Sequence, residues 1–457
     1  MVWARADRPS RMMVEYASRE DFADVRRITG PVVNAASDFT GRLDLKNLKD
    51  GQTFFVRVRF EDRDGRTLSE PAQGRFRTAS ASPRDIRFVW SADTVGQGYG
   101  INPDFGGMRI YEAMRRLEPD FFIHSGDTIY ADNPVQPEVR LPDGRVWKNL
   151  TTEAKSKVAE TLDEFRGNFQ YNLMDENVRR FNAAVPQIWQ WDDHEVCNNW
   201  SPGKDLQSMP EYKVKDIRVL SERSRQAFLE YSPMRFDSHA PRIYRRISYG
   251  PLLDMFVLDL RSYRAANNSN RQASESAETA YFGREQLNWL RRDLKNSRAA
   301  WKIMACDMPL GIIVRDGDGY ENSSNGDGPA LGRELEIANL LGFMKENRIR
   351  NVVWLTGDVH YTAAHYYDPA KAQFTNFDPF WEFVSGPLNA GTFGPNPPDN
   401  TFGIQVVYQK TPPAQNLAPL SGLQFFGEVL IEARAKTMTV NLRDLTGAAL
   451  FSKTLEP

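Results

Sequence analysis

The chain has 457 residues, which is more than one hydrophobic core normally supports, so we expect at least two domains. Hydrophobic residues make up 41% and charged residues 26%, as is typical of globular proteins. The net charge of -2 excludes a global basic field, so no affinity for nucleic acid is expected, and the two cysteines exclude a disulfide framework.

The N-terminus lacks the basic region and apolar stretch of a signal peptide. No apolar run of about 18 residues is present, so no membrane-spanning helix is expected. The segment Met1–Arg5 already has the pattern of a strand, which predicts that further residues of the native protein precede it. The sequence alone predicts neither the compartment nor the oligomeric state.

Residues 1–80 form the first predicted domain, and short strand-like runs separated by turn signals indicate an all-β fold. The segment Arg11–Tyr16 is strand-like, and Phe54–Phe60 alternates with period two, which places its apolar residues on one face. An Asp-Gly turn follows at Asp62–Arg66. This pattern resembles a fibronectin-type or immunoglobulin-like β-sandwich, and Ser80–Pro83 has the composition of a linker.

Residues 84–457 form the second predicted domain, in which short apolar runs alternate with longer amphipathic stretches, as in layered α/β folds. The predicted strands are Arg87–Ala92, Phe121–Ser125, Ile188–Trp191, Leu252–Leu258, Trp301–Cys306 and Val352–Leu355, with a late hairpin at Gly427–Ala433 and Thr437–Leu442. The predicted helices are Gly107–Leu117, Thr151–Met174, Val219–Tyr231, Arg284–Asn296 and Gly332–Asn347. Residues 316–328 and 388–420 are predicted loops.

Each of the six predicted strands before the hairpin leads into an aspartate. Aspartate often ends a strand because it suits turns and helix caps, and for one position that explanation is the stronger. The carboxyl ends of strands in layered folds converge on one crevice, where grouped carboxylates repel one another unless a multivalent cation binds them. The repetition therefore predicts a metal site. The aspartates are Asp93, Asp127, Asp192 with Asp193, Asp259, Asp307 and Asp358.

Two clusters sharpen this prediction. Tyr130 follows Asp127 by three residues, and a tyrosinate ligand favours a highly charged ion such as ferric iron. His360 follows Asp358 by two residues, so both side chains can reach neighbouring metals from one turn. The alternatives stay open: Tyr130 as a buried aromatic residue with a hydrogen-bonded hydroxyl, and His360 as a core histidine.

Taken in order, these segments resemble the calcineurin-type metallophosphoesterases, and within them the PhoD-like alkaline phosphatases and phosphodiesterases. The resemblance rests on Trp90–Asp93, Gly126–Tyr130, Trp191–Glu195, Leu258–Arg264 and Leu355–His360. It implies an α+β fold, a four-layer αββα sandwich preceded by the β-sandwich domain. It also implies a periplasmic or secreted enzyme that hydrolyses small phosphate esters by attack of a metal-activated water.

The resemblance also implies a ligand set. Asp127 would bridge two metals, and an iron site would be formed by Asp93, Asp127, Tyr130 and His360. Many PhoD-like proteins have a cysteine ligand after the first strand, whereas Asp93 stands there in this chain, as in purple acid phosphatases.

For a second metal site, Asp193 stands where the superfamily has asparagine, and Asp358 stands where it has histidine. Asp307 falls where another histidine ligand is common. Such an oxygen-rich site suits calcium or magnesium. We therefore expect Fe(III) with one or two Ca(II) ions, and other divalent metals stay open.

Two further side chains are predicted to bind substrate and take part in catalysis. His194 is placed to contact the phosphate or to protonate the leaving oxygen, and its alternative role is to orient a carboxylate. Arg261 can bind phosphate oxygens through its fork of N–H groups, and its alternative is an ion pair with Asp259.

Two other functions stay open at this point. The first is a phosphodiesterase or phospholipase-type enzyme with the same metal centre. The second is a non-catalytic calcium-dependent binding protein in which the aspartates are structural ligands. That second reading accounts for the carboxylates, but not for Tyr130, His194 and His360 beside them.

Overall fold

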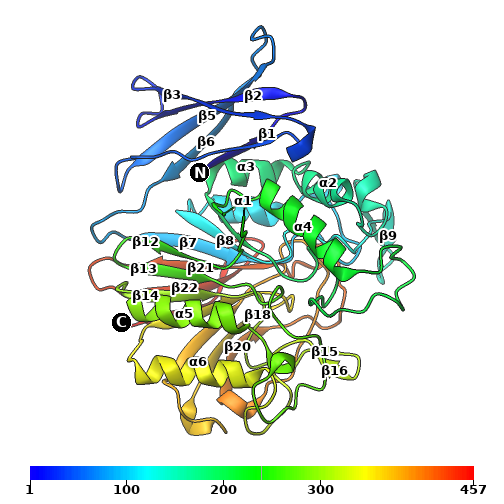
Figure 1. The fold of residues 1–457 in the computed structure, drawn as a ribbon, viewed down its shortest axis with the longest axis vertical. Coiled ribbons are helices and arrows are strands. Elements are labelled where there is room, and N and C mark those ends of the chain that lie inside the picture. Colours follow the sequence, from blue (N-terminus) through cyan, green and yellow to red (C-terminus); the bar gives the residue numbers. More distant parts are fainter. Residues whose placement is uncertain (238) are drawn as a thin grey trace.

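A computed structural model describes residues 1–237 and 239–457, and its N-terminal part is a small all-β unit beside a larger α/β body (Figure 1). A four-stranded sheet of order β3-β2-β5-β6 lies against the antiparallel pair β1-β4. Alternate residues of two strands, such as Met12 and Val14 or Val56 and Val58, point into its core. The predicted β-sandwich is confirmed. Its strands are β1 (Val2–Arg5), β2 (Ser10–Ala17), β3 (Arg26–Val33), β4 (Thr40–Leu43), β5 (Thr53–Asp62) and β6 (Ala72–Arg77).

The larger body contains two sheets. The six-stranded sheet has the order β11-β8-β7-β21-β22-β23, with β7, β8 and β11 parallel and β21 antiparallel to β7. Its strands are β7 (Ile86–Ser91), β8 (Phe121–Ser125), β11 (Gln187–Gln190), β21 (Phe425–Ile431), β22 (Met438–Asp444) and β23 (Ala449–Leu455). Two short hairpins lie outside the sheets: β9 (Glu138–Arg140) with β10 (Val146–Lys148), and β15 (Arg315–Asp316) with β16 (Gly319–Tyr320).

The seven-stranded sheet has the order β12-β13-β14-β17-β19-β18-β20. Its central strands β13, β14, β17 and β19 are parallel, so their carboxyl ends lie at the same edge. The strands are β12 (Arg245–Tyr249), β13 (Leu253–Val257), β14 (Trp301–Ala305), β17 (Val352–Thr356), β18 (Thr362–Tyr367), β19 (Phe380–Val384) and β20 (Ile404–Lys410).

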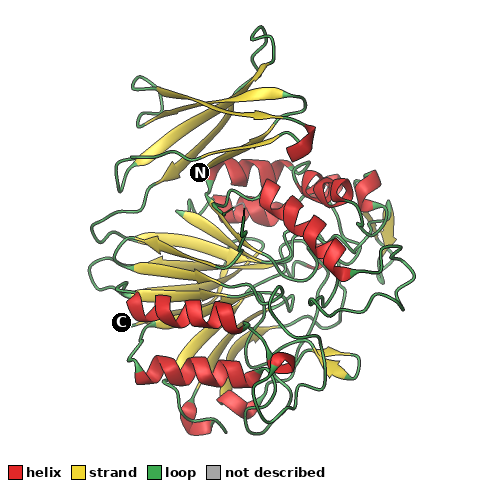
Figure 2. Cartoon of the chain, in the orientation of Figure 1, coloured by secondary structure: helices red, strands yellow, loops and turns green. Residues whose placement is uncertain are grey.

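The two sheets pack face to face and helices cover their outer faces, which confirms the predicted αββα sandwich (Figure 2). On β7, Trp90 faces the other sheet while Val89 faces the helices α1 and α3. On β13, Met255 faces inward while Phe256 packs toward α5 and α6. Strands buried on both faces read as continuous apolar runs, and this explains why the sequence revealed them. The helices are α1 (Arg109–Arg115), α2 (Leu162–Asn172), α3 (Glu176–Ala184), α4 (Ile217–Tyr231), α5 (Arg284–Asn296) and α6 (Glu334–Glu346).

The predicted helix Thr151–Met174 is wrong over its first part, because α2 begins only at Leu162. Thr161 and Glu164 form a reciprocal capping box that fixes this start. The predicted loop 388–420 is also wrong in part, because it contains β20. Within the described residues, no helix has the length and apolar character needed to cross a membrane.

The β-sandwich is held on the helices α2 and α4 by specific contacts. The indole Nε1 of Trp3 donates a hydrogen bond of 2.8 Å to the carbonyl of Glu230. Arg166 on α2 pairs with the Glu230 carboxylate at 2.7 Å and donates at 2.7 Å to the carbonyl of Ala36. The contacts of Trp3 and of Ala36 join the two parts of the chain.

Candidate metal centre

Aspartates at the ends of strands from both sheets lie close together. Asp93 follows β7, Asp127 follows β8 and Asp358 follows β17, and all three have left-handed backbone conformations, with φ of 68°, 54° and 67°. Aspartate tolerates this region better than most residues do. The glycine before Asp127 is required, because a Cβ at Gly126 would lie 2.4 Å from the Cβ of Asp192. The loops therefore approach closely enough to bring their carboxylates together.

Three groups of side chains in the described residues have ligand atoms that all lie within 4.8 Å of one another. Asp127 belongs to two of these groups and Asp193 belongs to two, so the groups form one continuous row, which we call the acidic centre. The first group is Asp93, Asp127 and His360; the second is Asp127, Asp193 and His194; the third is Asp192, Asp193 and Asp358.

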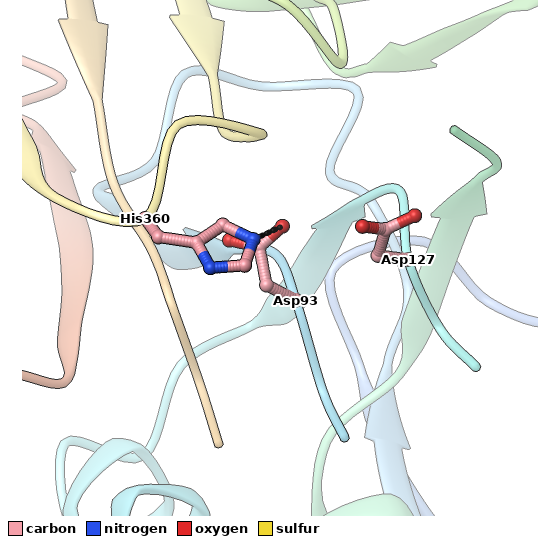
Figure 3. A group of neighbouring side chains, drawn as sticks. All are labelled: Asp93, Asp127 and His360. Carbon is pink, nitrogen blue, oxygen red and sulfur yellow. Dashed lines mark ion pairs between the residues drawn. The ribbon is translucent and has the colours of Figure 1, made fainter. Parts of the chain in front are cut away.

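The first donor group has the chemistry of a transition-metal site (Figure 3). The Nε2 of His360 lies 3.6 Å from Asp93 Oδ1 and accepts a hydrogen bond of 2.9 Å from the Tyr130 hydroxyl. The opposite ring nitrogen, Nδ1, donates to the carbonyl of Gly391 at 2.5 Å, which fixes the ring. Burial lowers the pKa of His360 to about 4, so its imidazole is neutral and has a lone pair to offer.

The two carboxylates of the first donor group, Asp93 and Asp127, are buried close to further carboxylates. Burial raises the pKa of Asp93 and of Asp127 well above the usual range, and neighbouring carboxylates add to the effect. Both carboxylate oxygens of Asp93 are buried without a hydrogen-bond partner. A buried, unpaired carboxylate is costly unless it binds a cation. The donor set therefore fits a multivalent metal ion.

The Tyr130 hydroxyl lies at this same point. Its side chain is fully buried, and burial together with Asp127 and Asp93 raises the pKa of Tyr130 well above its usual range. Phenolate formation here consequently requires a strongly charged cation close to the oxygen. The structure thus brings Tyr130 together with Asp93, Asp127 and His360, and its role as a metal ligand stays a prediction.

Arg261 is the buried cation at the other end of the acidic centre. Its side chain is 0% exposed, and its Nη2 lies 2.5 Å from Asp192 Oδ1 while its Nη1 lies 2.6 Å from Glu321 Oε1. Its Nε lies 3.5 Å from Asp307 Oδ2. Asp307, which was also predicted as a ligand, lies outside the three donor groups of the described residues. Burial raises the pKa of Asp307 to about 6.

Asp259 illustrates the simpler role of a strand-end aspartate. One carboxylate oxygen, Oδ1, accepts hydrogen bonds from the backbone N–H groups of Arg261 and Ser262 and from the indole of Trp191. These contacts make it a turn-forming residue. The side chain of Arg261 pairs with other carboxylates instead, so the alternative of an Arg261–Asp259 side-chain ion pair is not the observed arrangement.

His194 belongs to the acidic centre, and its ring is held by the carboxylate of Asp132, which was not predicted from the sequence. Its Nδ1 donates to Asp132 Oδ1 at 2.7 Å, and its ring stacks on Tyr130 with 4.2 Å between ring centroids. Burial alone would lower the pKa of His194, but Asp132, Asp193 and Asp127 raise it well above the usual value. The imidazole is therefore held in place within the second donor group, and the neighbouring carboxylates favour its protonated form. The only sequence signal for Asp132 is its place two residues after Tyr130.

A second missed residue, Glu195, ties two loops of the centre together. Its Oε2 accepts from the backbone N–H groups of Asp127 and Asp192, and its Oε1 accepts from the backbone and hydroxyl of Thr128. The residue is fully buried. Its place in the Asp-Asp-His-Glu run was visible in the sequence, but nothing there distinguished this structural role.

Lys155, which contacts Tyr130, is expected to make the stability of the protein depend on pH. Its Nζ donates at 2.7 Å to the carbonyl of Tyr130, and burial lowers its pKa to about 7. The unfolded chain binds a proton at this lysine up to about pH 10, whereas the folded chain releases it above about pH 7. The free energy of unfolding should therefore rise through that window by at most ~1.4 kcal/mol per pH unit from this group.

Urea unfolding of the wild-type chain and of Lys155→Met at several pH values checks this sign. We expect Lys155→Met to lose part of the rise, because methionine has no proton to exchange. The same pH dependence in both proteins would contradict the assignment of a depressed pKa to Lys155.

Two family models and one known protein match this chain. The family model described as PhoD-like phosphatase matches residues 88–442, and that described as PhoD-like phosphatase, N-terminal domain, matches residues 1–80. The chain is 26% identical to alkaline phosphatase D of Bacillus subtilis (strain 168) over 363 residues, which cover 76% of this chain and 57% of that relative. The chain thus spans less than two thirds of the length of this relative.

Solved structures share the fold. One described as the structure of PhoD is similar with a TM-score of 0.71 and 20% identity, covering 99% of this chain and 85% of that one. Purple acid phosphatase PPD1 from yellow lupin (Lupinus luteus) seeds is similar with a TM-score of 0.55 and 11% identity, covering 98% and 70%. At these identities the likeness concerns the arrangement of sheets and helices.

Proposed function

Because the chain belongs to the family of PhoD-like phosphatases, we propose that it hydrolyses small phosphate esters at the acidic centre. The observation that carries the proposal is the continuous row of three donor groups, which share Asp127 and Asp193. Phosphoryl transfer needs concentrated positive charge and an aligned nucleophile more than it needs covalent chemistry from the protein. A buried row of carboxylates is a means of collecting that positive charge as metal ions.

We propose Fe(III) at Asp93, Asp127, Tyr130 and His360, and one or two Ca(II) ions toward Asp193, Asp358 and Asp307. The mixed oxygen and nitrogen donors of the first set suit iron, while the carboxylates of the second suit calcium. When bound, such ions supply charge neutralisation for the phosphate and lower the pKa of water.

The protein side chains would then position the substrate and move protons. His194 is placed to donate a proton to the leaving oxygen, since Asp132 orients its ring and favours the protonated form. Direct binding of phosphate by Arg261 stays a prediction, because its guanidinium is occupied by carboxylates in this structure.

The variant His194→Gln tests the proton transfer. We expect kcat to fall about 100-fold for an alkyl phosphate such as glycerol 2-phosphate, whose leaving oxygen needs a proton. The loss should be smaller for p-nitrophenyl phosphate, whose leaving group departs as an anion. Asp132→Asn should give a weaker version of the same pattern. Equal losses on both esters in His194→Gln would contradict the role.

The family match and the sheet arrangement also support one proposal on the domains and one on the location of the protein. Residues 1–80 and 84–457 would be separate domains, in agreement with the separate family models that match residues 1–80 and 88–442. The resemblance supports a periplasmic or secreted location for the chain.

Hydrolysis assays on the natively purified protein test the function. We expect turnover of p-nitrophenyl phosphate, of its bis ester, or of both, and the ratio of the two kcat/KM values decides between a monoesterase and a diesterase. Absence of turnover with both esters, in protein whose metal content is complete, would contradict the proposal.

A further inference from the structure

The guanidinium of Arg261 occupies the position toward which the third donor group converges. Its Nη2 lies 2.5 Å from Asp192 Oδ1, 3.7 Å from Asp358 Oδ1 and 3.9 Å from Asp193 Oδ1. These are the same three residues whose oxygens lie close enough to hold a metal ion. One nitrogen of one arginine is therefore within ion-pair distance of every member of that group.

The contacts of the two terminal nitrogens of Arg261 fall into two classes. Two are short, to Asp192 at 2.5 Å and to Glu321 at 2.6 Å on the opposite arm of the guanidinium. The contacts to Asp358 and Asp193 are more than 1 Å longer, at 3.7 Å and 3.9 Å. The Nε of Arg261 also donates a hydrogen bond of 2.6 Å to Asp192 Oδ1. The contacts with Asp192 and Glu321 therefore anchor the side chain, whereas the longer ones only neutralise charge.

A metal ion in the third group would lie close to this guanidinium. Calcium ions need carboxylate oxygens at about 2.3–2.6 Å, and like charges repel strongly in a buried site. The same oxygens of Asp193 and Asp358 cannot give full neutralisation to both cations. A bound metal ion would then replace Arg261 as the partner of Asp193 and Asp358. The contacts of Arg261 with Asp192 and Glu321 would stay in place.

Building on the proposed metal centre, we propose that Arg261 is a built-in cation that competes with a divalent metal ion for Asp193 and Asp358. The arginine neutralises these carboxylates while the metal is away, and it weakens the binding of the metal that replaces it. The second metal would accordingly be the exchangeable one, held less tightly than the ion in the first donor group. Arg261 thereby regulates occupancy of the centre.

Calcium binding by metal-stripped protein tests the competition. We compare the wild-type chain with Arg261→Met, which keeps much of the side-chain volume without the charge, and with Arg261→Lys, which keeps the charge. Isothermal titration with calcium chloride should show Arg261→Met binding calcium at least about tenfold more tightly than wild type, because its competitor is gone. Arg261→Lys should stay closer to wild type. Equal or weaker calcium binding by folded Arg261→Met would overturn the proposal.

Thermal unfolding keeps the test decisive if the neutral variant is unstable. Without divalent ions, Arg261→Met should melt at a lower temperature than wild type, because its carboxylates have lost their resident cation. Added calcium should raise the melting temperature of Arg261→Met more than that of wild type. A variant that folds only with calcium supports the proposal, whereas one that stays unfolded at every calcium concentration contradicts it.

Neither measurement uses a phosphate ester. A chain that hydrolyses no ester can still show the competition between Arg261 and calcium, so the failure of the proposed function is separable from the failure of this inference. Conversely, an active phosphatase whose calcium affinity is independent of Arg261 would remove only the inference.

Discussion

Replacing Asp127 with asparagine is expected to lower kcat/KM for phosphate esters by at least about a hundredfold, because even supporting residues of metal sites cost 10–100-fold. Asp127 belongs to two donor groups, and its Oδ1 also accepts the backbone N–H of His194 at 3.1 Å. Asparagine is almost isosteric but cannot bridge two metals as an anion. Metal analysis of Asp127→Asn should show loss of at least one ion per chain.

The matched control is Asp254→Asn, which makes the same change in another buried carboxylate. Asp254 lies near the beginning of β13, away from the carboxyl ends of the strands, and pairs with Arg246 at 2.7 Å. We expect it to reduce stability while leaving metal content and kcat/KM close to wild type. If Asp127→Asn keeps wild-type activity and metal content, the bridging assignment is wrong.

The second large effect is expected in the visible absorption spectrum of the protein. A tyrosinate bound to ferric iron absorbs visible light, so the natively purified protein should have a visible band that Tyr130→Phe lacks. The Tyr130 hydroxyl is buried and lies 2.9 Å from Nε2 of His360, so it is held beside another donor of the proposed iron site. Loss of the phenol should also lower kcat, because the iron site loses an anionic ligand.

Tyr171→Phe is the matched control for this spectrum. The Tyr171 hydroxyl is also buried and hydrogen-bonded, donating at 2.8 Å to the carbonyl of Leu150, but Tyr171 is not part of the acidic centre. Its removal should leave the band unchanged. A colourless iron-containing wild-type protein, or a Tyr130→Phe variant that retains the band, would contradict the tyrosinate assignment.

The strand ends were predictable because each parallel strand is buried on both faces and so reads as an apolar run ending in a polar residue. That pattern predicted that Asp93, Asp127 and Asp358 lie close together, as the structure has them, while their role as metal ligands stays a prediction. It could not separate them from Asp259, whose carboxylate bonds to its own turn. Both kinds of aspartate look alike in the sequence, and only the direction of the side chain differs.

The supporting residues were less predictable for a physical reason. Asp132 orients His194 across 62 positions of sequence, and Glu321 meets Arg261 from beyond α5 and β14. Such partners depend on where loops meet in space, about which periodicity carries no information. The same limit explains β20, an edge strand whose Val406 and Val407 are exposed and which therefore lacks a clear apolar face.

Elemental analysis of the natively purified protein, paired with a phosphatase assay before and after chelation, tests the central claim most directly. The account predicts about one iron and one or two calcium ions per chain, and activity that falls with their removal and returns with their addition. Full activity in metal-free protein would contradict the account. Metal-replete protein that leaves every phosphate ester intact would equally contradict it, and would favour a calcium-binding role without catalysis.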